Sequence, residues 1–495
     1  MNSTSMKKAL IPGAALILLA IFAGITACGT APVETAPPPP VETTQPSPVE
    51  KGEPSPQVEP EPEPSGTLLI LARMPALLKA GDYDGALALF DEIEAGEAAA
   101  TGIQLLKASV LNSAGRNRDA RSIVNGILAR EGENTGALLV LANIYRAEGK
   151  EKEQKQTLEN IIKIDPAHVD ALVGLGNIAL RANSYRNAAS FFDKALTEEP
   201  ENGYALVGRA GVYRHNKNYG QASALLSQAI SLYPEWAVPR SERARVYRIN
   251  GALPNAIADL QTAKELDPNN FWISNDLGKV LIDMNRKNEA LEEFSRAATL
   301  DPDNFLAYVY TAGIKDELGD YDGAEKDYAT ITKLKPEYYF AFEGLGTIKM
   351  RKGRWAEAKD AFLQAYRYAP NEAAYALLAA ANWMRAERLQ APRQFLESAM
   401  KKVPRESLEY YMLRLYFDLN GDTEVAGRVD REKSMVTKAR MAYYLGLYYE
   451  IRGSIIADRY YTLVKELDQK AVPEWRLNEW ALASRNLANG AARAP

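Results

Sequence analysis

The sequence predicts an all-α fold, a solenoid built from helical hairpins, and three observations lead to this fold class. The hexapeptide GDYDGA occurs at 81–86 and again at 319–324, and the separation of 238 residues is seven periods of 34. A Pro follows the last helix of each of eight consecutive 34-residue repeats. Apolar residues within each repeat recur with the spacing of one helix face. A fixed period of this length is typical of stacked helical repeats.

The chain begins with the features of an export signal. Two lysines precede the apolar run ALIPGAALILLAIFAGITA, and small residues crowd its end. A basic segment followed by an apolar one of this length predicts a cleaved signal peptide over residues 1–27. A transmembrane anchor is the alternative, but a Pro and two Gly interrupt the run.

The end of this signal resembles the lipobox of bacterial lipoproteins. The motif is ITAC at 25–28, and Cys28 is the only Cys in the chain. The resemblance implies that Cys28 becomes the mature N-terminus and carries diacylglycerol and palmitate, and no other cofactor is expected. Two or three acyl chains give stable membrane anchoring. Gly29 follows the Cys rather than Asp, which in a cell with two membranes favours the outer membrane.

Residues 28–66 are predicted to form an unstructured tether. From residue 29 onward this segment holds 12 Pro, seven Glu and one Lys, with no aromatic residue. Such a composition cannot bury enough apolar surface to fold, and Pro keeps it extended at ~3.1 Å per residue. The tether would hold the rest of the chain up to roughly 100 Å from a membrane. A Pro-rich ligand for a partner domain is the alternative interpretation.

Residues 67–406 hold ten consecutive 34-residue repeats without an insertion. Position 20 of the repeat is almost always Ala, position 24 is large and apolar, and position 27 is Ala or Ile. This spacing of four and three residues forms one stripe of a second helix. Position 15 is Gly or Asn in eight of ten repeats, which suits a left-handed helix cap. The prolines that end the repeats are Pro166, Pro200, Pro234, Pro268, Pro302, Pro336, Pro370 and Pro404.

These columns resemble the tetratricopeptide repeat (TPR), a 34-residue helix–turn–helix motif. In the repeat at 169–202 the matching residues are Leu172, Leu175, Gly176, Ala188, Phe192, Ala195 and Pro200. The resemblance implies a right-handed solenoid that binds other proteins or peptides. The first two repeats lack the Pro and the tenth has Pro392 where Ala is usual, as expected for repeats at the end of an array.

Residues 407–495 are predicted to form two irregular repeats and a closing helix at 473–487. This segment is rich in adjacent tyrosines, which one helix cannot turn to the same face. They could form an aromatic docking surface, but packing on two neighbours is favoured for most of them. The pairs are Tyr410–Tyr411, Tyr443–Tyr444, Tyr448–Tyr449 and Tyr460–Tyr461.

No motif predicts an enzyme. GLGNIA at 174–179 fits a loose dinucleotide fingerprint, but it lies inside a predicted helix and GLGTIK at 344–349 repeats it in the same phase. Helix packing therefore explains these glycines better than nucleotide binding does. One Cys and two His argue against a metal site, and a net charge of −5 argues against nucleic acid.

In the TPR family, partner peptides lie in a groove lined by the outward face of each first helix. The resemblance places candidate groove residues at positions 2, 5, 9, 12 and 13 of each repeat. Basic and polar residues occupy these positions in the earlier repeats. Further along the chain the same positions hold Asp283, Asp316, Glu317 and Glu343, followed by Arg351, so the groove is predicted to run from basic to acidic. An acidic peptide or extended segment is expected on the stretch from Arg181 to Lys279, although charges scattered on a solvated face are the alternative. The basic part comprises Asn143, Arg146, Asn177, Arg181, Arg214, Arg245, Arg248 and Lys279.

The sequence thus predicts an exported lipoprotein that displays a TPR solenoid from a tether. Its expected role is a protein–protein interaction scaffold or assembly factor of the bacterial cell envelope. A surface-exposed adhesin is one alternative. An accessory protein that binds cell-wall glycan or a small ligand is another.

Overall fold

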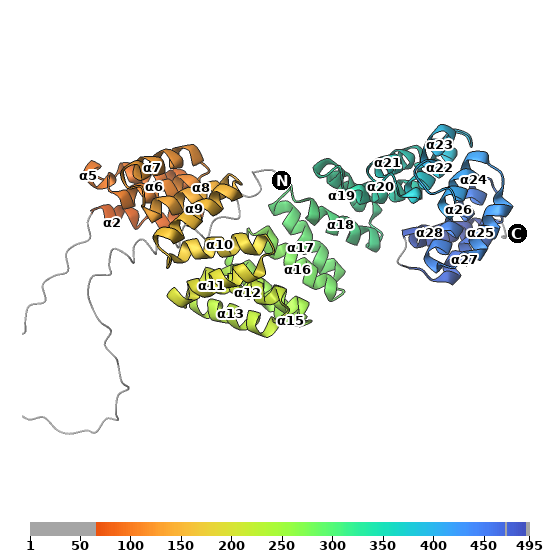
Figure 1. Cartoon of the computed structure of the whole chain (residues 1–495). Coiled ribbons are helices and arrows are strands. Elements are labelled where there is room, and N and C mark those ends of the chain that lie inside the picture. The colour runs from red at the N-terminus through yellow and green to blue at the C-terminus, as the bar shows by residue number, and fades with distance from the viewer. Residues whose placement is uncertain (1–65, 471–472, 492–495) are drawn as a thin grey trace, which may run out of the picture. The chain divides into compact units, whose positions relative to one another are not determined.

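The structure is a computed structural model that describes residues 66–470 and 473–491 (Figure 1). The predicted signal peptide, Cys28 and the tether up to residue 65 lie outside the described residues. All regular elements of the described chain are helices, which confirms the all-α fold class. None of these helices is both long enough and apolar enough to span a bilayer.

The chain divides into an N-terminal unit that ends at Pro268 and a C-terminal unit that begins at Asn269. The helices of the N-terminal unit are α2 (Gly66–Leu71), α3 (Met74–Ala80), α4 (Tyr83–Ala88), the 3-10 turn η2 (Leu89–Asp91), α5 (Ala95–Ala98), α6 (Thr101–Ser113), α7 (Asn117–Arg130), α8 (Thr135–Ala147), α9 (Glu151–Ile164), α10 (Val169–Arg181), α11 (Tyr185–Glu198), α12 (Gly203–His215), α13 (Tyr219–Leu232), α14 (Ala237–Ile249) and α15 (Leu253–Leu266).

The C-terminal unit continues the same pattern and adds further helices after the tenth repeat. Its helices are α16 (Phe271–Asp283), α17 (Lys287–Leu300), α18 (Phe305–Leu318), α19 (Tyr321–Leu334), α20 (Tyr339–Arg351), α21 (Trp355–Tyr368), α22 (Ala373–Ala386), α23 (Arg393–Met400), α24 (Leu408–Asp418), α25 (Asp422–Arg431), α26 (Met435–Ile451), α27 (Ala457–Leu467) and α28 (Pro473–Ala491).

Each regular repeat folds as a hairpin, and within each unit its second helix also packs on the first helix of the next repeat. The predicted stripe forms the contact surface between the two helices. In the repeat that begins at Val169, Ala188, Phe192 and Ala195 have no solvent-exposed surface. The buried stripe of large apolar residues flanked by Ala or Ile therefore lies in the core of the hairpins, as the sequence predicts.

The large residue of the stripe is accommodated by glycines on the neighbouring first helices. A Cβ added to Gly176 of α10 would lie 2.7 Å from the ring of Phe192, and one added to Gly208 of α12 would lie 2.3 Å from it. Gly344 faces the Tyr328 ring in the same way. The packing interpretation of GLGNIA and GLGTIK is thereby confirmed.

The corner between the two helices is left-handed in nine of the ten repeats, even where the residue is not Gly. Lys217 occupies this corner with φ of 62°, and the exception is Glu387 of the tenth repeat with φ of −127°. In the GDYDGA copies, Asp82 Oδ1 accepts a hydrogen bond from the Gly85 amide at 2.8 Å, and Asp320 accepts one from Gly323 at 3.0 Å. The hexapeptide thus turns the chain, and its first Asp caps the second helix.

The terminal repeats depart from the regular hairpin. In the first repeat the first helix is interrupted between Leu71 and Met74, and the second shortens to α4 followed by a 3-10 turn. No earlier hairpin covers this repeat in the described chain, so one flank lacks packing support. In the tenth repeat the second helix begins only after Pro392, because Pro is tolerated at a helix start and not in its interior.

The tyrosine pairs of the C-terminal segment are largely core residues. Tyr443, Tyr444 and Tyr461 are fully buried, and Tyr448, Tyr449 and Tyr460 are at most 8% exposed. Tyr410 and Tyr411 are half-buried. The packing interpretation is therefore confirmed for most pairs.

We predict that Gly208→Ala destabilises the N-terminal unit by about 1–3 kcal/mol, the usual cost of overpacking a filled core. The added methyl group would overlap the Phe192 ring. Gly126→Ala is the matched control, because its site in the middle of α7 is exposed and a Cβ there meets nothing within 4 Å. That control should gain about 0.5–1 kcal/mol from higher helix propensity. Chemical denaturation of both variants measures the difference.

A smaller side chain should rescue the overpacked variant. Adding Phe192→Leu to Gly208→Ala is expected to recover part of the loss, since the ring and the new methyl group compete for one space. Equal stability of the Gly208→Ala and Gly126→Ala variants would contradict the packing scheme.

Candidate functional site

The face of the first helices in the N-terminal unit carries the first four predicted groove residues. We call the outward surface of α8, α10, α12 and α14 the first-helix face. Asn143 and Arg146 lie on α8, and Asn177 and Arg181 lie on α10, one repeat further. The two Asn side chains are half-buried and form no hydrogen bond with other described residues. They leave amide donors and acceptors available for a ligand.

Arg146 and Arg181 lie close enough on this face for their charges to interact. Arg146 is exposed and makes no ion pair within the described chain. Desolvation by surrounding protein, and then the nearby charge of Arg181, lower the pKa of Arg146, which nevertheless stays protonated. Arg181 has one loose partner, Glu151, at 3.3 Å, and both side chains are at least half exposed. An exposed ion pair of this kind contributes little stability and is easily exchanged for a ligand.

The remaining predicted residues are compensated more strongly. Glu242 of α14 lies 3.7 Å from Arg214 and also pairs with Arg245, so one carboxylate serves two arginines. Arg248 is half-buried in the last turn of α14 and has an interaction partner. Lys279 belongs to α16 of the C-terminal unit, where its Nζ lies 3.1 Å from Asp276.

Two residues at position 2 of the repeat extend the first-helix face beyond the predicted set. Burial raises the pKa of Tyr204 on α12 to about 12, while the nearby charge of Arg146 acts in the opposite direction. Desolvation raises the pKa of Asp170 on α10. Position 2 is one of the candidate groove positions, so the repeat frame alone could have identified both residues.

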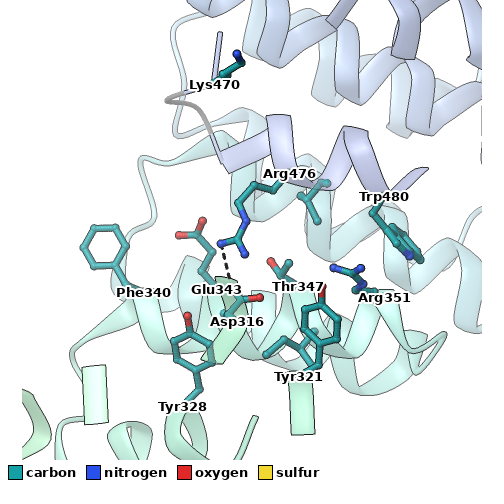
Figure 2. Close-up of a pocket in the computed structure, with 13 residues that line it drawn as sticks. Asp316, Tyr321, Tyr328, Phe340, Glu343, Thr347, Arg351, Lys470, Arg476 and Trp480 are labelled. Atoms are coloured by element: carbon teal, nitrogen blue, oxygen red, sulfur yellow. Dashed lines mark ion pairs between the residues drawn. The ribbon is translucent and has the colours of Figure 1, made fainter. Parts of the chain in front are cut away.

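The C-terminal unit holds a pocket of about 340 Å³ (Figure 2). The last helix, α28, lies opposite α18, α19 and α20 across this space. Thirteen residues line it, and they combine aromatic and aliphatic side chains with charged ones. They are Asp316, Tyr321, Tyr328, Phe340, Glu343, Gly344, Thr347, Ile348, Arg351, Lys470, Arg476, Leu477 and Trp480.

Two carboxylates in this pocket are already engaged. Arg476 of α28 reaches across to Asp316 of α18, with 3.1 Å between Nη1 and Oδ2, as Figure 2 shows. Tyr375 donates a hydrogen bond of 2.7 Å to Glu343. Burial raises the pKa of Glu343 despite this bond.

Arg351 also lines the pocket, and it contacts an aromatic ring rather than a charged side chain. Its guanidinium lies 3.9 Å from the centre of the Tyr321 ring, and it forms no ion pair with another described residue. A cation over an aromatic face is held in place without losing its charge.

Helix α28 is fixed to the unit on its other side. The buried Glu474 accepts hydrogen bonds from Arg440 Nε at 3.1 Å and from the Tyr444 hydroxyl at 2.7 Å. Asn478 donates to the backbone oxygen of Tyr461 at 3.0 Å. The wall of the pocket that α28 forms is therefore an anchored part of the fold.

Sequence reasoning identified only one side of this pocket. Asp316, Glu343 and Arg351 were predicted groove residues, and the structure brings them together. Arg476 and Trp480 were missed because α28 lies outside the repeat and no spacing rule relates it to α18 or α20. Among the described residues, no group of three or more His, Cys, Asp or Glu is placed to hold a metal ion.

Comparison with protein families identifies the repeat. One family model described as tetratricopeptide repeat matches residues 77–144 and 179–240, and a second with this description matches 139–203 and 275–339. A model described as TPR repeat matches residues 244–285. Together these matches cover more than half of the chain. No curated protein sequence matches this chain.

Solved structures with a similar fold include TPR proteins of low sequence identity that cover part of this chain. TTC0263, a thermophilic TPR protein of Thermus thermophilus, is 21% identical over 36% of this chain and 98% of its own, with a TM-score of 0.34. A tetratricopeptide repeat protein of Parabacteroides merdae is 18% identical over 50% and 97%, with a TM-score of 0.38. PilF of Pseudomonas aeruginosa is 20% identical over 42% and 94%, with a TM-score of 0.37.

We predict that Glu343→Gln stabilises the C-terminal unit near pH 8 and loses this advantage as the pH falls. Because burial raises the pKa of Glu343 above its ordinary 4.5, the ionised form destabilises the folded state at pH values above the raised pKa. That cost disappears as pH falls through the raised pKa towards 4.5. Gln still accepts the hydrogen bond from Tyr375. Thermal unfolding of variant and wild type across this range measures the change, and a difference independent of pH would contradict it.

Proposed function

The chain belongs to the tetratricopeptide repeat family, whose members are scaffolds for protein–protein interaction, and from that premise we propose its role. It is a membrane-anchored scaffold or assembly factor of the bacterial cell envelope. It holds acidic segments of partner proteins on the first-helix face of the N-terminal unit. No catalytic step is part of this role.

One observation carries the proposed site, namely the unpaired Arg146 beside the loosely paired Arg181. Two like charges held close together raise the energy of the free protein, and an acidic ligand removes that repulsion. The Asn143 and Asn177 amides lie on the same two helices and supply hydrogen bonds beside the charges. Arg214 and Arg245 extend the positive surface along the array, although Glu242 partly neutralises them.

The proposed membrane anchor rests on the sequence alone. Cys28 follows the apolar segment directly, and the stretch between it and residue 66 is rich in Pro, a composition that favours an extended tether. A scaffold on such a tether searches the space near its membrane at high local concentration.

We predict that joint charge reversal, Arg146→Glu with Arg181→Glu, lowers partner recovery at least ~10-fold, since each charge-assisted hydrogen bond contributes about 1.5–3 kcal/mol. The measurement is co-purification of envelope proteins with the full-length chain at low and high salt. Wild-type recovery should fall as salt screens the attraction, whereas the residual recovery of the variant should not.

Arg186→Glu on α11 is the control for this experiment, because Arg186 is exposed on a second helix. It changes the net charge in the same direction and should leave recovery unchanged. Recovery unaffected by the double reversal, or reduced equally by the control, would contradict the proposed site.

Membrane attachment is tested separately with Cys28→Ser. The wild-type chain is expected to incorporate labelled palmitate and to sediment with membranes when expressed in a bacterium that processes lipoproteins. The variant has no other Cys to acylate and should lose both the label and the membrane association. A variant that still sediments with membranes without the label would show that the anchor is not Cys28.

A further inference from the structure

The pocket opposite α28 is a second candidate binding site, distinct from the first-helix face of the N-terminal unit. Its volume of about 340 Å³ falls within the range of roughly 300–1,000 Å³ that small-ligand sites occupy. Ile348 and Leu477 supply aliphatic surface, and the rings of Tyr321 and Trp480 lie near the position of Arg351 (Figure 2). Phe340, half exposed, adds an apolar surface at another edge.

The charges of this pocket leave a single cation for a ligand. The Asp316 carboxylate is matched by Arg476, and Glu343 has its hydrogen bond from Tyr375. Lys470 pairs with the neighbouring Asp468 at 3.3 Å. Arg351 is the one cation lining the pocket that has no counter-ion in the described chain.

Arg351 is also oriented for recognition. The Tyr321 ring holds one face of its guanidinium, and the N–H groups at the edge of that plane are free to bind a carboxylate in a bidentate manner. Thr347 lies one helical turn earlier on α20 and also lines the pocket. Its hydroxyl has no hydrogen-bond partner among the described residues. The two side chains therefore offer donors to one anion.

We propose that this pocket binds a carboxylate carried on an aromatic or branched apolar body. The carboxylate is held by Arg351 and Thr347, and the apolar body lies against Tyr321, Trp480 and Leu477. The carboxylate belongs either to the C-terminal residue of a peptide or to a small free acid. A cationic ligand fits less well, because both acids of the pocket already have partners.

The test is isothermal titration calorimetry of the full-length chain with two matched pairs of probes. The pairs are 3-phenylpropionate with its amide, and acetyl-Ala-Ala-Phe as the free acid with its C-terminal amide. Each acid should bind at least ~10-fold more tightly than its amide, the loss expected when a charge-assisted contact is removed. Arg351→Gln should abolish the difference between acid and amide, Arg351→Lys should retain part of it, and Thr347→Val should reduce it several-fold.

Two controls keep the result specific. Arg388→Gln removes an exposed Arg from the same unit and should leave the preference for the acid unchanged. The Arg146→Glu and Arg181→Glu chain should also bind the acids normally, so failure of the first-helix face and failure of this pocket are separately visible.

The two probe pairs also distinguish the source of the ligand. A peptide acid that binds at least ~10-fold more tightly than 3-phenylpropionate identifies a chain terminus, whereas equal affinities identify a small acid. Equal affinities of acid and amide in the wild-type chain would overturn the proposal. So would an acid preference that survives Arg351→Gln.

Discussion

The ring of Phe192 fits between α10 and α12 only because Gly176 and Gly208, which face it, have no side chain. The same fit of a ring against a glycine recurs where Phe294 meets Gly278 and where Phe362 meets Gly346. Protein interiors are packed densely enough that one methyl group changes the distance between helices. This contact therefore limits how closely successive hairpins approach in the repeats that share it.

The repeat could be predicted from the sequence because its causes are local and recur every 34 residues. The corner at Lys217 shows how far the array can override a single residue: the side chain is unfavourable at φ of 62°, yet the hairpin packing on both sides imposes that conformation. At the N-terminal end no earlier hairpin of the described chain supplies this support. The interruption of the first helix before Met74, and the loss of the left-handed corner at Glu387 of the tenth repeat, are not predicted by the 34-residue frame alone.

The functional surface could be predicted only in part, for the same reason. Residues that project from a regular helix, such as Arg214 and Asp316, follow from the frame. Their partners do not, because Glu242 lies outside the positions assigned to the groove and Arg476 lies on a helix outside the repeat. Charge counted along the frame thus overstated the basic character near Arg214. It also missed that Arg476 of α28 pairs with Asp316, which leaves Arg351 as the cation of the pocket without a counter-ion in the described chain.

The central claim is that partner polypeptides lie on the first-helix face. Site-specific photocrosslinking in living cells tests it most directly, with the photoreactive residue placed at Asn177 on α10 or at Lys194 on α11 of the same hairpin. Both sites are accessible enough to carry the label, but only Asn177 lies on the first-helix face. Discrete adducts with envelope proteins are expected from Asn177 and not from Lys194. Adducts of equal yield from both positions, or from Lys194 alone, would contradict the claim.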